Sequence, residues 1–184
     1  MSLRMQPAVL DVEPAWEIAK IFPAQGTWAE EDYLLLPGNR LVEYSHGIVE
    51  VLSMPSYAHQ LVTAWLFEAL KAFVRGGGLG AVVFAPMRLR LWAGKYREPD
   101  LLFMFKHNRY RIHSQYWDGA DLVMEVVSPD DPTRDLETKR REYAQAGIPE
   151  YWLINPLSET ITVFTLPEHA SVYAIHGVYD RSSR

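Results

Sequence analysis

The segment DLVMEVVSP, residues 121–129, constrains the fold more than any other part of the chain. Apolar residues fill it almost without a break: Leu122, Val123, Met124, Val126 and Val127. Such a run is typical of a strand that is buried on both faces of a sheet. Glu125 interrupts the run, and a carboxylate among apolar neighbours is costly to desolvate unless a positive group meets it. We therefore expect a cationic partner for Glu125.

The elements upstream of this strand predict a helix, a hairpin and a second, longer helix. Thr27 and Glu30 have the spacing of a capping box, which predicts a helix over TWAEEDYLLLP that Pro37 stops. RLVEYSHGIVEVLS, residues 40–53, is typical of a β-hairpin that turns at residues 45–47, where Gly47 suits a left-handed position. A helical stripe then runs through PSYAHQLVTAWLFEALKAFVRGGG, residues 55–78, and the glycines end it. Its members are Val62, Leu66, Leu70 and Phe73.

Strands are predicted at about 81–85, 88–92, 99–105 and 121–127, followed by a helix at about 133–146. Pro132 suits the first turn of that helix and Gly147 its C-terminal cap. EYWLIN, TITVFT and a segment beginning near Tyr173 follow as strands. The order of helix, three or four strands, helix and strand predicts an α/β fold around a mixed sheet. We expect one domain over residues 1–184, with an irregular lead-in at 1–25.

Composition removes several classes of function. The chain has no cysteine, which excludes a disulfide framework, a thiolate metal site and a cysteine nucleophile. No apolar run is long enough to span a bilayer and no signal segment opens the chain, so we expect a cytoplasmic protein. A net charge of −5 argues against general coating of nucleic acid, although two basic runs, 106–113 and 134–141, leave room for a local basic groove.

Two further polar residues stand where apolar ones are expected. Asp100 opens the strand DLLFMF immediately after Pro99. Lys139 lies about 60° from Leu136 and about 40° from Tyr143 around the second predicted helix, so it borders the apolar stripe. Arg140 borders the stripe from the other side, and periodicity alone does not choose between the two cations.

These residue types predict chemistry on a phosphate. Two carboxylates on neighbouring strands, Asp100 and Glu125, can converge on Mg²⁺, which prefers oxygen ligands. The cation polarises a phosphate oxygen and lowers the pKa of a bound water, and a lysine such as Lys139 stabilises the developing charge. The structural alternative is a buried Glu125–Lys139 ion pair, with Asp100 capping a turn and Asp135 pairing with Lys139 at i,i+4.

His59 and Glu43 are further candidates. His59 extends the apolar stripe of the long helix towards its start, where it is either a satisfied core histidine or a residue that binds phosphate, touches the metal shell or relays a proton. Glu43, on the hairpin strand before that helix, is either a further carboxylate of the site or a residue of the strand surface.

Several stretches resemble one known family. The Pro-Asp pair at 99–100 and DLVMEVVSPDDPTRDLETKRREYAQAGIPEYWLINP at 121–156 closely resemble the Uma-two family of restriction endonucleases, within the PD-(D/E)xK nuclease superfamily. TWAEEDYLLLP, VEYSHGIVEVLSMPS and HQLV also resemble the corresponding segments of that family. The resemblance covers most of residues 27–165.

The resemblance implies a restriction-endonuclease-like fold with an αβββαβ core, here preceded by the N-terminal helix and hairpin, and Mg²⁺-dependent cleavage of DNA with Mn²⁺ as a substitute. Asp100 and Glu125 would bind the metal, with the carbonyl of Val126 as a third oxygen. Val127 stands where the superfamily places its lysine, so Lys139 would supply the amine from the next helix. His59 as a catalytic residue and Glu43 as a metal ligand match positions where such proteins carry the same residue types.

The main hypothesis is therefore a metal-dependent endodeoxyribonuclease. The alternative is a catalytically inactive module on the nuclease fold that binds nucleic acid or protein, and a third option is hydrolysis of RNA or a nucleotide. Many enzymes of this fold cut two strands as dimers, so a homodimer is expected if aromatic residues are exposed. The candidates for that surface are Trp16, Trp28, Trp92 and Trp117.

Overall fold

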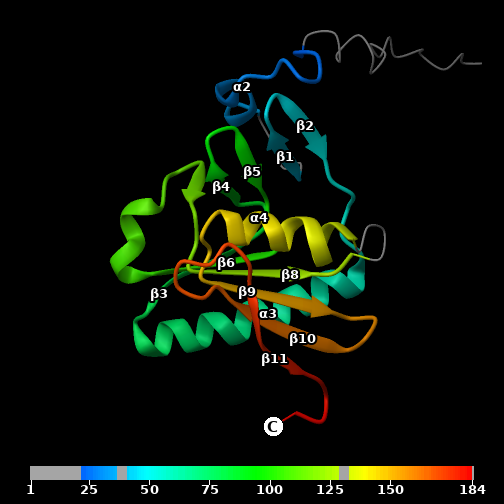
Figure 1. Ribbon diagram of the computed structural model, residues 1–184, viewed down its shortest axis with the longest axis vertical. Coiled ribbons are helices and arrows are strands. Elements are labelled where there is room, and N and C mark those ends of the chain that lie inside the picture. Colours follow the sequence, from blue (N-terminus) through cyan, green and yellow to red (C-terminus); the bar gives the residue numbers. More distant parts are fainter. Residues whose placement is uncertain (1–21, 37–40, 129–132, 184) are drawn as a thin grey trace, which may run out of the picture.

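The computed structural model describes residues 22–36, 41–128 and 133–183, and it arranges their strands in two sheets (Figure 1). The larger sheet has six strands in the order β11 (Ala174–Tyr179), β10 (Thr160–Thr165), β9 (Glu150–Asn155), β8 (Leu122–Val126), β6 (Leu101–Phe105) and β3 (Gly80–Phe84). The smaller sheet has five, in the order β2 (Ile48–Val51), β1 (Val42–Ser45), β5 (Lys95–Arg97), β4 (Arg88–Trp92) and β7 (Tyr116–Asp118).

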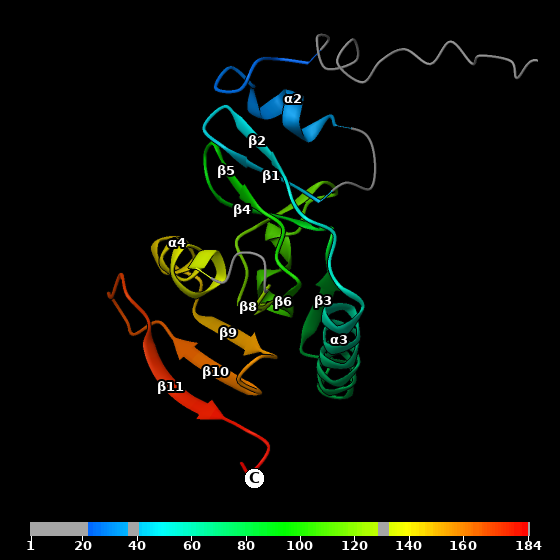
Figure 2. The same cartoon turned by 90° about the vertical axis from the view of Figure 1, so that its right-hand side faces the viewer.

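Strand β8 lies in the interior of the larger sheet and is buried on both faces, as its apolar run predicts. It pairs antiparallel with β6 and parallel with β9, so the sheet is mixed. Val123 and Val127 belong to the core cluster on one face, while Leu122, Met124 and Val126 belong to the cluster on the other. Helix α4 (Arg140–Gln145) packs into the first cluster and α3 (Tyr57–Gly77) into the second. Figure 2 shows these two helices on opposite sides of the sheet.

Helix α3 begins and ends where the sequence predicts. The Ser56 hydroxyl accepts a hydrogen bond from the His59 backbone N–H at 3.2 Å, which caps the first turn. At the other end Gly78 adopts a left-handed conformation with φ of 59°, which glycine reaches without steric cost. The start of this helix carries His59, whose ring lies 3.1 Å from the carboxylate of Asp100, the residue before β6.

The hairpin is confirmed, but the predicted capping box is wrong. Gly47 has a φ of 85°, and a Cβ there would lie 2.7 Å from the Gly26 carbonyl oxygen. Helix α2 (Glu30–Leu34) has no side-chain cap. The Thr27 hydroxyl instead donates to the Ala24 carbonyl, and the Glu30 carboxylate accepts from the Gly94 N–H and the Tyr96 hydroxyl of the smaller sheet. A local turn thus takes the Thr27 side chain away from the helix start, and tertiary partners take that of Glu30.

The second predicted helix is not a single α-helix. Residues Arg134–Lys139, labelled η2, wind as a π-helix, and α4 continues from Arg140. Gly147 ends it at a φ of 72°. The predictions made for Pro37, Pro132, Trp16 and most of the 1–25 lead-in fall outside the described residues.

The aromatic surface expected for pairing of two copies is partly wrong, because Trp28 and Trp117 lie in the core. Trp117 is only 2% exposed. Strands β5 and β7, of three residues each, were not predicted; their short charged or mixed sequences carry no strand periodicity. A 3₁₀ helix, η1 (Lys106–Arg111), connects β6 to β7. Over the described part of the chain, no helix has the length and apolar content needed to cross a membrane.

Candidate active site

Two partners on the second helical segment meet the buried carboxylate of Glu125. Alternation along β8 places Glu125 on the same face as Val123 and Val127, which is the face that η2 and α4 cover. Lys139 Nζ lies 2.9 Å from one carboxylate oxygen, and the Tyr143 hydroxyl donates to the other at 2.5 Å. Glu125 is 2% exposed. Both of its oxygens therefore accept hydrogen bonds, and one of the two donors, the Lys139 ammonium, is positively charged.

Lys139 lies between two carboxylates. Its ammonium is 2.9 Å from Glu125 and 3.0 Å from Asp135, so the buried pair and the i,i+4 pair are both present. The side chain is buried, whereas Arg140 is exposed and its guanidinium lies over the Phe164 ring at 5.4 Å. The π-helical winding of η2 turns Lys139 inwards, and this selects it over Arg140.

Several carboxylates face the single ammonium group of Lys139. Burial raises the pKa of Glu125 to about 8; Lys139 acts against that shift, while the charges of Asp100 and Asp135 add to it. Burial alone lowers the pKa of Lys139, but the carboxylates that face it outweigh burial and raise it. These carboxylates are Glu125, Glu43, Asp135 and Asp100. The carboxylates around Lys139 therefore keep its ammonium charged, while burial favours the protonated form of Glu125.

Asp100 joins this cluster through backbone geometry. It immediately precedes β6, the neighbour of β8, and its carboxylate accepts a hydrogen bond from the Val126 N–H at 2.7 Å. His59 Nε2 lies 3.1 Å from the same oxygen. Burial lowers the pKa of His59, but the hydrogen bond and charge of Asp100 outweigh burial, and a hydrogen bond to the Val126 carbonyl adds to them, so the pKa is raised. His59 therefore contacts two of the oxygens expected to bind a metal.

All of these groups border one cavity of about 720 Å³. Asp100, Glu125, Val126, Asp135 and Lys139 line it from the sheet and from η2. One side of α3, from His59 to Lys71, lines it from another side, and both apolar and charged side chains complete the wall. Acids, amine and imidazole are thus gathered at one concave site, which is the usual form of a catalytic site.

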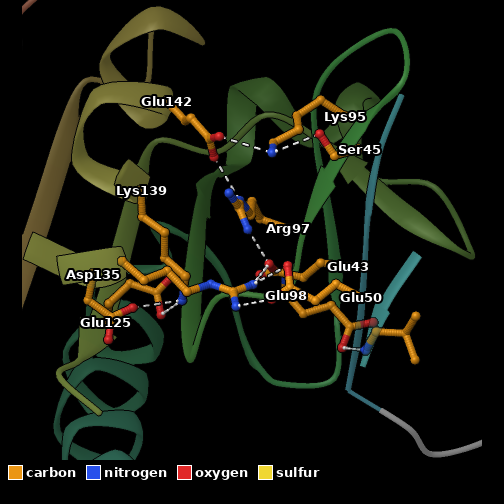
Figure 3. Close-up of polar contacts among 12 residues, drawn as sticks. Glu43, Ser45, Glu50, Lys95, Arg97, Glu98, Glu125, Asp135, Lys139 and Glu142 are labelled. Carbon is orange, nitrogen blue, oxygen red and sulfur yellow. Dashed lines mark hydrogen bonds and ion pairs between the residues drawn. The ribbon is translucent and has the colours of Figure 1, made fainter. Parts of the chain in front are cut away.

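Glu43 lies next to this site but pairs with arginines. Its carboxylate accepts hydrogen bonds from Arg97 of β5 and Arg134 of η2, and from the Glu98 N–H at 3.2 Å (Figure 3). Burial raises the pKa of Glu43, but Lys139, Arg97 and Arg134 outweigh burial and lower it to about 2. Glu43 is therefore a buried anion that links the smaller sheet to the helix carrying Lys139. Its expected role as a metal ligand stays a prediction.

A second link holds the same helix three residues after Lys139. Glu142 of α4 accepts from Lys95 at 2.9 Å and from Arg97 at 2.7 Å, and both cations are buried on β5 (Figure 3). We name the ion pairs of Glu43, Lys95, Arg97, Arg134 and Glu142 the charge clamp. It fastens η2 and α4 to the smaller sheet on both sides of Lys139. The sequence pointed to Glu43 alone, because the clamp depends on the unpredicted strand β5.

The residues at this site supply the kind of ligand atoms that a magnesium ion requires. Asp100, Glu125 and the Val126 carbonyl offer hard oxygen atoms at one wall of the cavity, which is the ligand type that Mg²⁺ prefers. Within residues 22–36, 41–128 and 133–183, no three acidic or histidine side chains already form a metal-binding group. His59, Lys139 and Tyr143 contact the carboxylate oxygens of Asp100 and Glu125.

Comparison with known structures finds a similar fold. A crystal structure described as "a putative nuclease belonging to DUF820 from Anabaena variabilis ATCC 29413" aligns with a TM-score of 0.65 at 18% identity. The alignment covers 82% of this chain and 83% of that one. At this identity the likeness establishes the fold, and it agrees with the restriction-endonuclease-like architecture expected from the sequence.

The family follows from the sequence. Residues 30–183 match the model of Uma2, the Uma-two family above, which is described as "Putative restriction endonuclease". The chain belongs to the Uma2 family. No curated protein matches it. Family and fold together support a nuclease.

Proposed function

We propose that this protein is a metal-dependent endonuclease that hydrolyses phosphodiester bonds in DNA, with Mg²⁺ as its cofactor and Mn²⁺ as a substitute. Asp100, Glu125 and the carbonyl of Val126 would hold the cation. The observation that carries the proposal is the convergence of Asp100, Glu125 and Lys139, from three separate elements, on one cavity.

The chemistry divides between the cofactor and the chain. When bound, a divalent cation polarises the scissile phosphate and lowers the pKa of a water molecule. Lys139, whose raised pKa keeps it charged, stabilises the negative charge that develops on the phosphate. Asp135 and Glu125 hold the Lys139 ammonium at the cavity wall. The charge clamp keeps its helix from moving away, so little reorganisation is needed when the substrate binds.

His59 takes the role of a proton donor or phosphate ligand in this proposal. Its raised pKa favours the imidazolium at neutral pH, and its ring lies at the cavity wall beside Asp100. His59 contacts the Asp100 oxygen that would bind the cation, so metal binding would leave the imidazole at the cavity wall available to the substrate. In this proposal Glu43 contributes to catalysis by positioning Arg134 and Lys139. It would act as a metal ligand instead if the coordination shell of the cation included its carboxylate.

Plasmid cleavage tests the proposal. Supercoiled DNA is incubated with the protein and Mg²⁺ or Mn²⁺, and nicked and linear products are quantified for wild type, Asp100→Asn, Glu125→Gln and Lys139→Met. We expect at least a hundredfold loss of rate in each variant. Glu137→Gln is the matched control, because Glu137 is an exposed acid on the same π-helix. Cleavage that survives unchanged in Asp100→Asn and Glu125→Gln rejects the assignment, and cleavage of RNA alone rejects the DNA substrate.

The second candidate function is an inactive binding module on the nuclease fold. Val127, buried in the core at the superfamily's lysine position, favours it. Titration calorimetry with Mn²⁺ separates the two: binding that is lost in Asp100→Asn argues against an inert scaffold, and absence of binding supports it.

A further inference from the structure

The cavity that holds the proposed catalytic groups continues along helix α3. His59, Thr63, Phe67 and Lys71 all line it. Their four-residue spacing places them in one row on the helix surface, and at 1.5 Å per residue the row is about 18 Å long. One wall thus leads from the imidazole beside Asp100 to a lysine about 18 Å further along the helix.

Two aromatic rings form part of this cavity wall. Phe67 of α3 and Phe84 of β3 contact each other edge to face, with ring centroids 4.7 Å apart. Phe84 is 54% exposed although it lines the cavity, and Lys71 Nζ lies 5.0 Å from the centre of the Phe67 ring. A large apolar ring left open in a concave site is typical of a surface that a ligand covers.

Strand pairing places these rings next to the proposed metal ligands. Phe84 lies opposite Leu101, the residue that follows Asp100, and the Ala85 N–H donates to the Asp100 carbonyl at 3.1 Å. A ligand that covers Phe84 therefore continues directly into the catalytic part of the cavity.

The charges along this wall indicate what kind of contact supplies affinity. The acids Glu68 and Glu98 line the cavity together with the cations Lys71, Arg134 and Lys139, and the whole chain carries a net charge of −5, so charge alone does not select the ligand. Lys71 is the cation at the aromatic end. Stacking of a base on an aromatic ring does not depend on such charge, but it needs a base whose face is open. A base inside a duplex is already stacked on its neighbours, so the ligand must be unpaired.

We propose that Phe84 and Phe67 form a subsite for an unpaired nucleobase, with Lys71 contacting a neighbouring phosphate. The inference rests on the proposed function and sharpens it: the substrate is a single strand, or a duplex that is locally unpaired next to the cut. The cavity volume of about 720 Å³ is within the usual range for sites that enclose a ligand of nucleotide size.

Fluorescence anisotropy with a labelled 12-nucleotide oligothymidine in EDTA, where no cleavage occurs, tests the subsite. We expect Phe84→Ala to weaken binding by about 5- to 100-fold and Phe84→Trp to retain it. Phe73→Ala is the matched control, since Phe73 is an exposed phenylalanine of helix α3, which also carries Phe67 and Lys71, and is not part of the cavity wall. Lys71→Gln should lower the slope of log affinity against log salt by about 0.7. A blunt duplex of the same length should bind at least tenfold more weakly.

The two assays, strand binding and DNA nicking, distinguish a wrong subsite proposal from a wrong nuclease proposal. If the wild type nicks DNA but Phe84→Ala binds the strand as tightly as wild type does, the subsite is wrong and the nuclease stands. If no variant nicks DNA but strand binding depends on Phe84, the subsite stands and the nuclease proposal falls. Failure of the wild type to bind the strand, or equal loss in Phe73→Ala, overturns the subsite.

Discussion

Replacing Glu43 by glutamine removes the one carboxylate that Arg97 and Arg134 share, and the expected cost follows from its pKa. The folded protein lowers the pKa of Glu43 from an ordinary value of 4.5 to about 2. Each unit is worth about 1.4 kcal/mol, so ionised Glu43 stabilises the fold by about 3 kcal/mol. Glu43 is 2% exposed, so solvent screening takes little from this figure. Breaking a buried ion pair costs a similar amount, roughly 3–5 kcal/mol.

The cost of Glu43→Gln depends on pH, and the sign is fixed. A carboxylate with a lowered pKa contributes stability that is fully present above its unfolded pKa of about 4.5 and is lost as pH falls towards about 2. We therefore expect a loss of about 3 kcal/mol at pH 7, shrinking to about 1 kcal/mol at pH 3.

Urea unfolding followed by tryptophan fluorescence at pH 7, 5, 4 and 3 measures this difference. With an m value near 2 kcal/mol/M, the midpoint at pH 7 should fall by roughly 1.5 M. Glu50→Gln is the matched control: Glu50 also pairs with Arg134, but its side chain is 55% exposed, and we expect less than about 1 kcal/mol. A loss that does not vary with pH, or equal losses in the two variants, would refute the role of Glu43 as a buried anchor. Unchanged stability with lost Mn²⁺ binding would make it a metal ligand instead.

Three other predictions concern the groups around Lys139. Burial raises the pKa of Glu125 to about 8, so its contribution to stability is full below pH 4.5 and falls as pH rises through 8. In EDTA, urea unfolding should therefore show Glu125→Gln gaining stability relative to wild type between pH 5 and pH 8, and a constant difference contradicts this. Tyr143→Phe removes a buried donor to Glu125 and should cost about 1–3 kcal/mol in thermal unfolding; no change means that the hydrogen bond contributes nothing. Glu142→Gln weakens the charge clamp on the side of Lys139 that faces α4, so the cleavage rate at saturating DNA should fall about tenfold. Calorimetry should find the Mn²⁺ affinity unchanged, and loss of both cleavage and Mn²⁺ binding would place Glu142 at the metal.

The elements with strong periodicity could be predicted from the sequence. The continuous apolar run of β8 indicated an interior strand, and the long stripe with its glycines gave α3 within a few residues of its bounds. The misplaced Glu125 also predicted a buried cation. These predictions succeeded because burial on a face leaves a direct mark on residue order.

What the sequence could not supply depends on tertiary partners. Periodicity did not choose between Lys139 and Arg140, since it assumed an α-helix and η2 is a π-helix with more residues per turn. Lys95 and Arg97 alternate along a strand of three residues and look solvent-exposed, yet both are buried against Glu142. No local sequence pattern predicts such ion pairs, because the two partners of each pair lie on different elements.

The most direct test of the central claim is a crystal of the protein soaked in Mn²⁺ and measured for anomalous scattering. We predict one strong peak at the cavity wall, within about 2.1 Å of oxygen atoms of Asp100, Glu125 and the Val126 carbonyl, with Lys139 Nζ beside it. The His59 ring should have moved off Asp100. A soaked crystal in which the peak is missing, or lies away from both Asp100 and Glu125, would contradict the account.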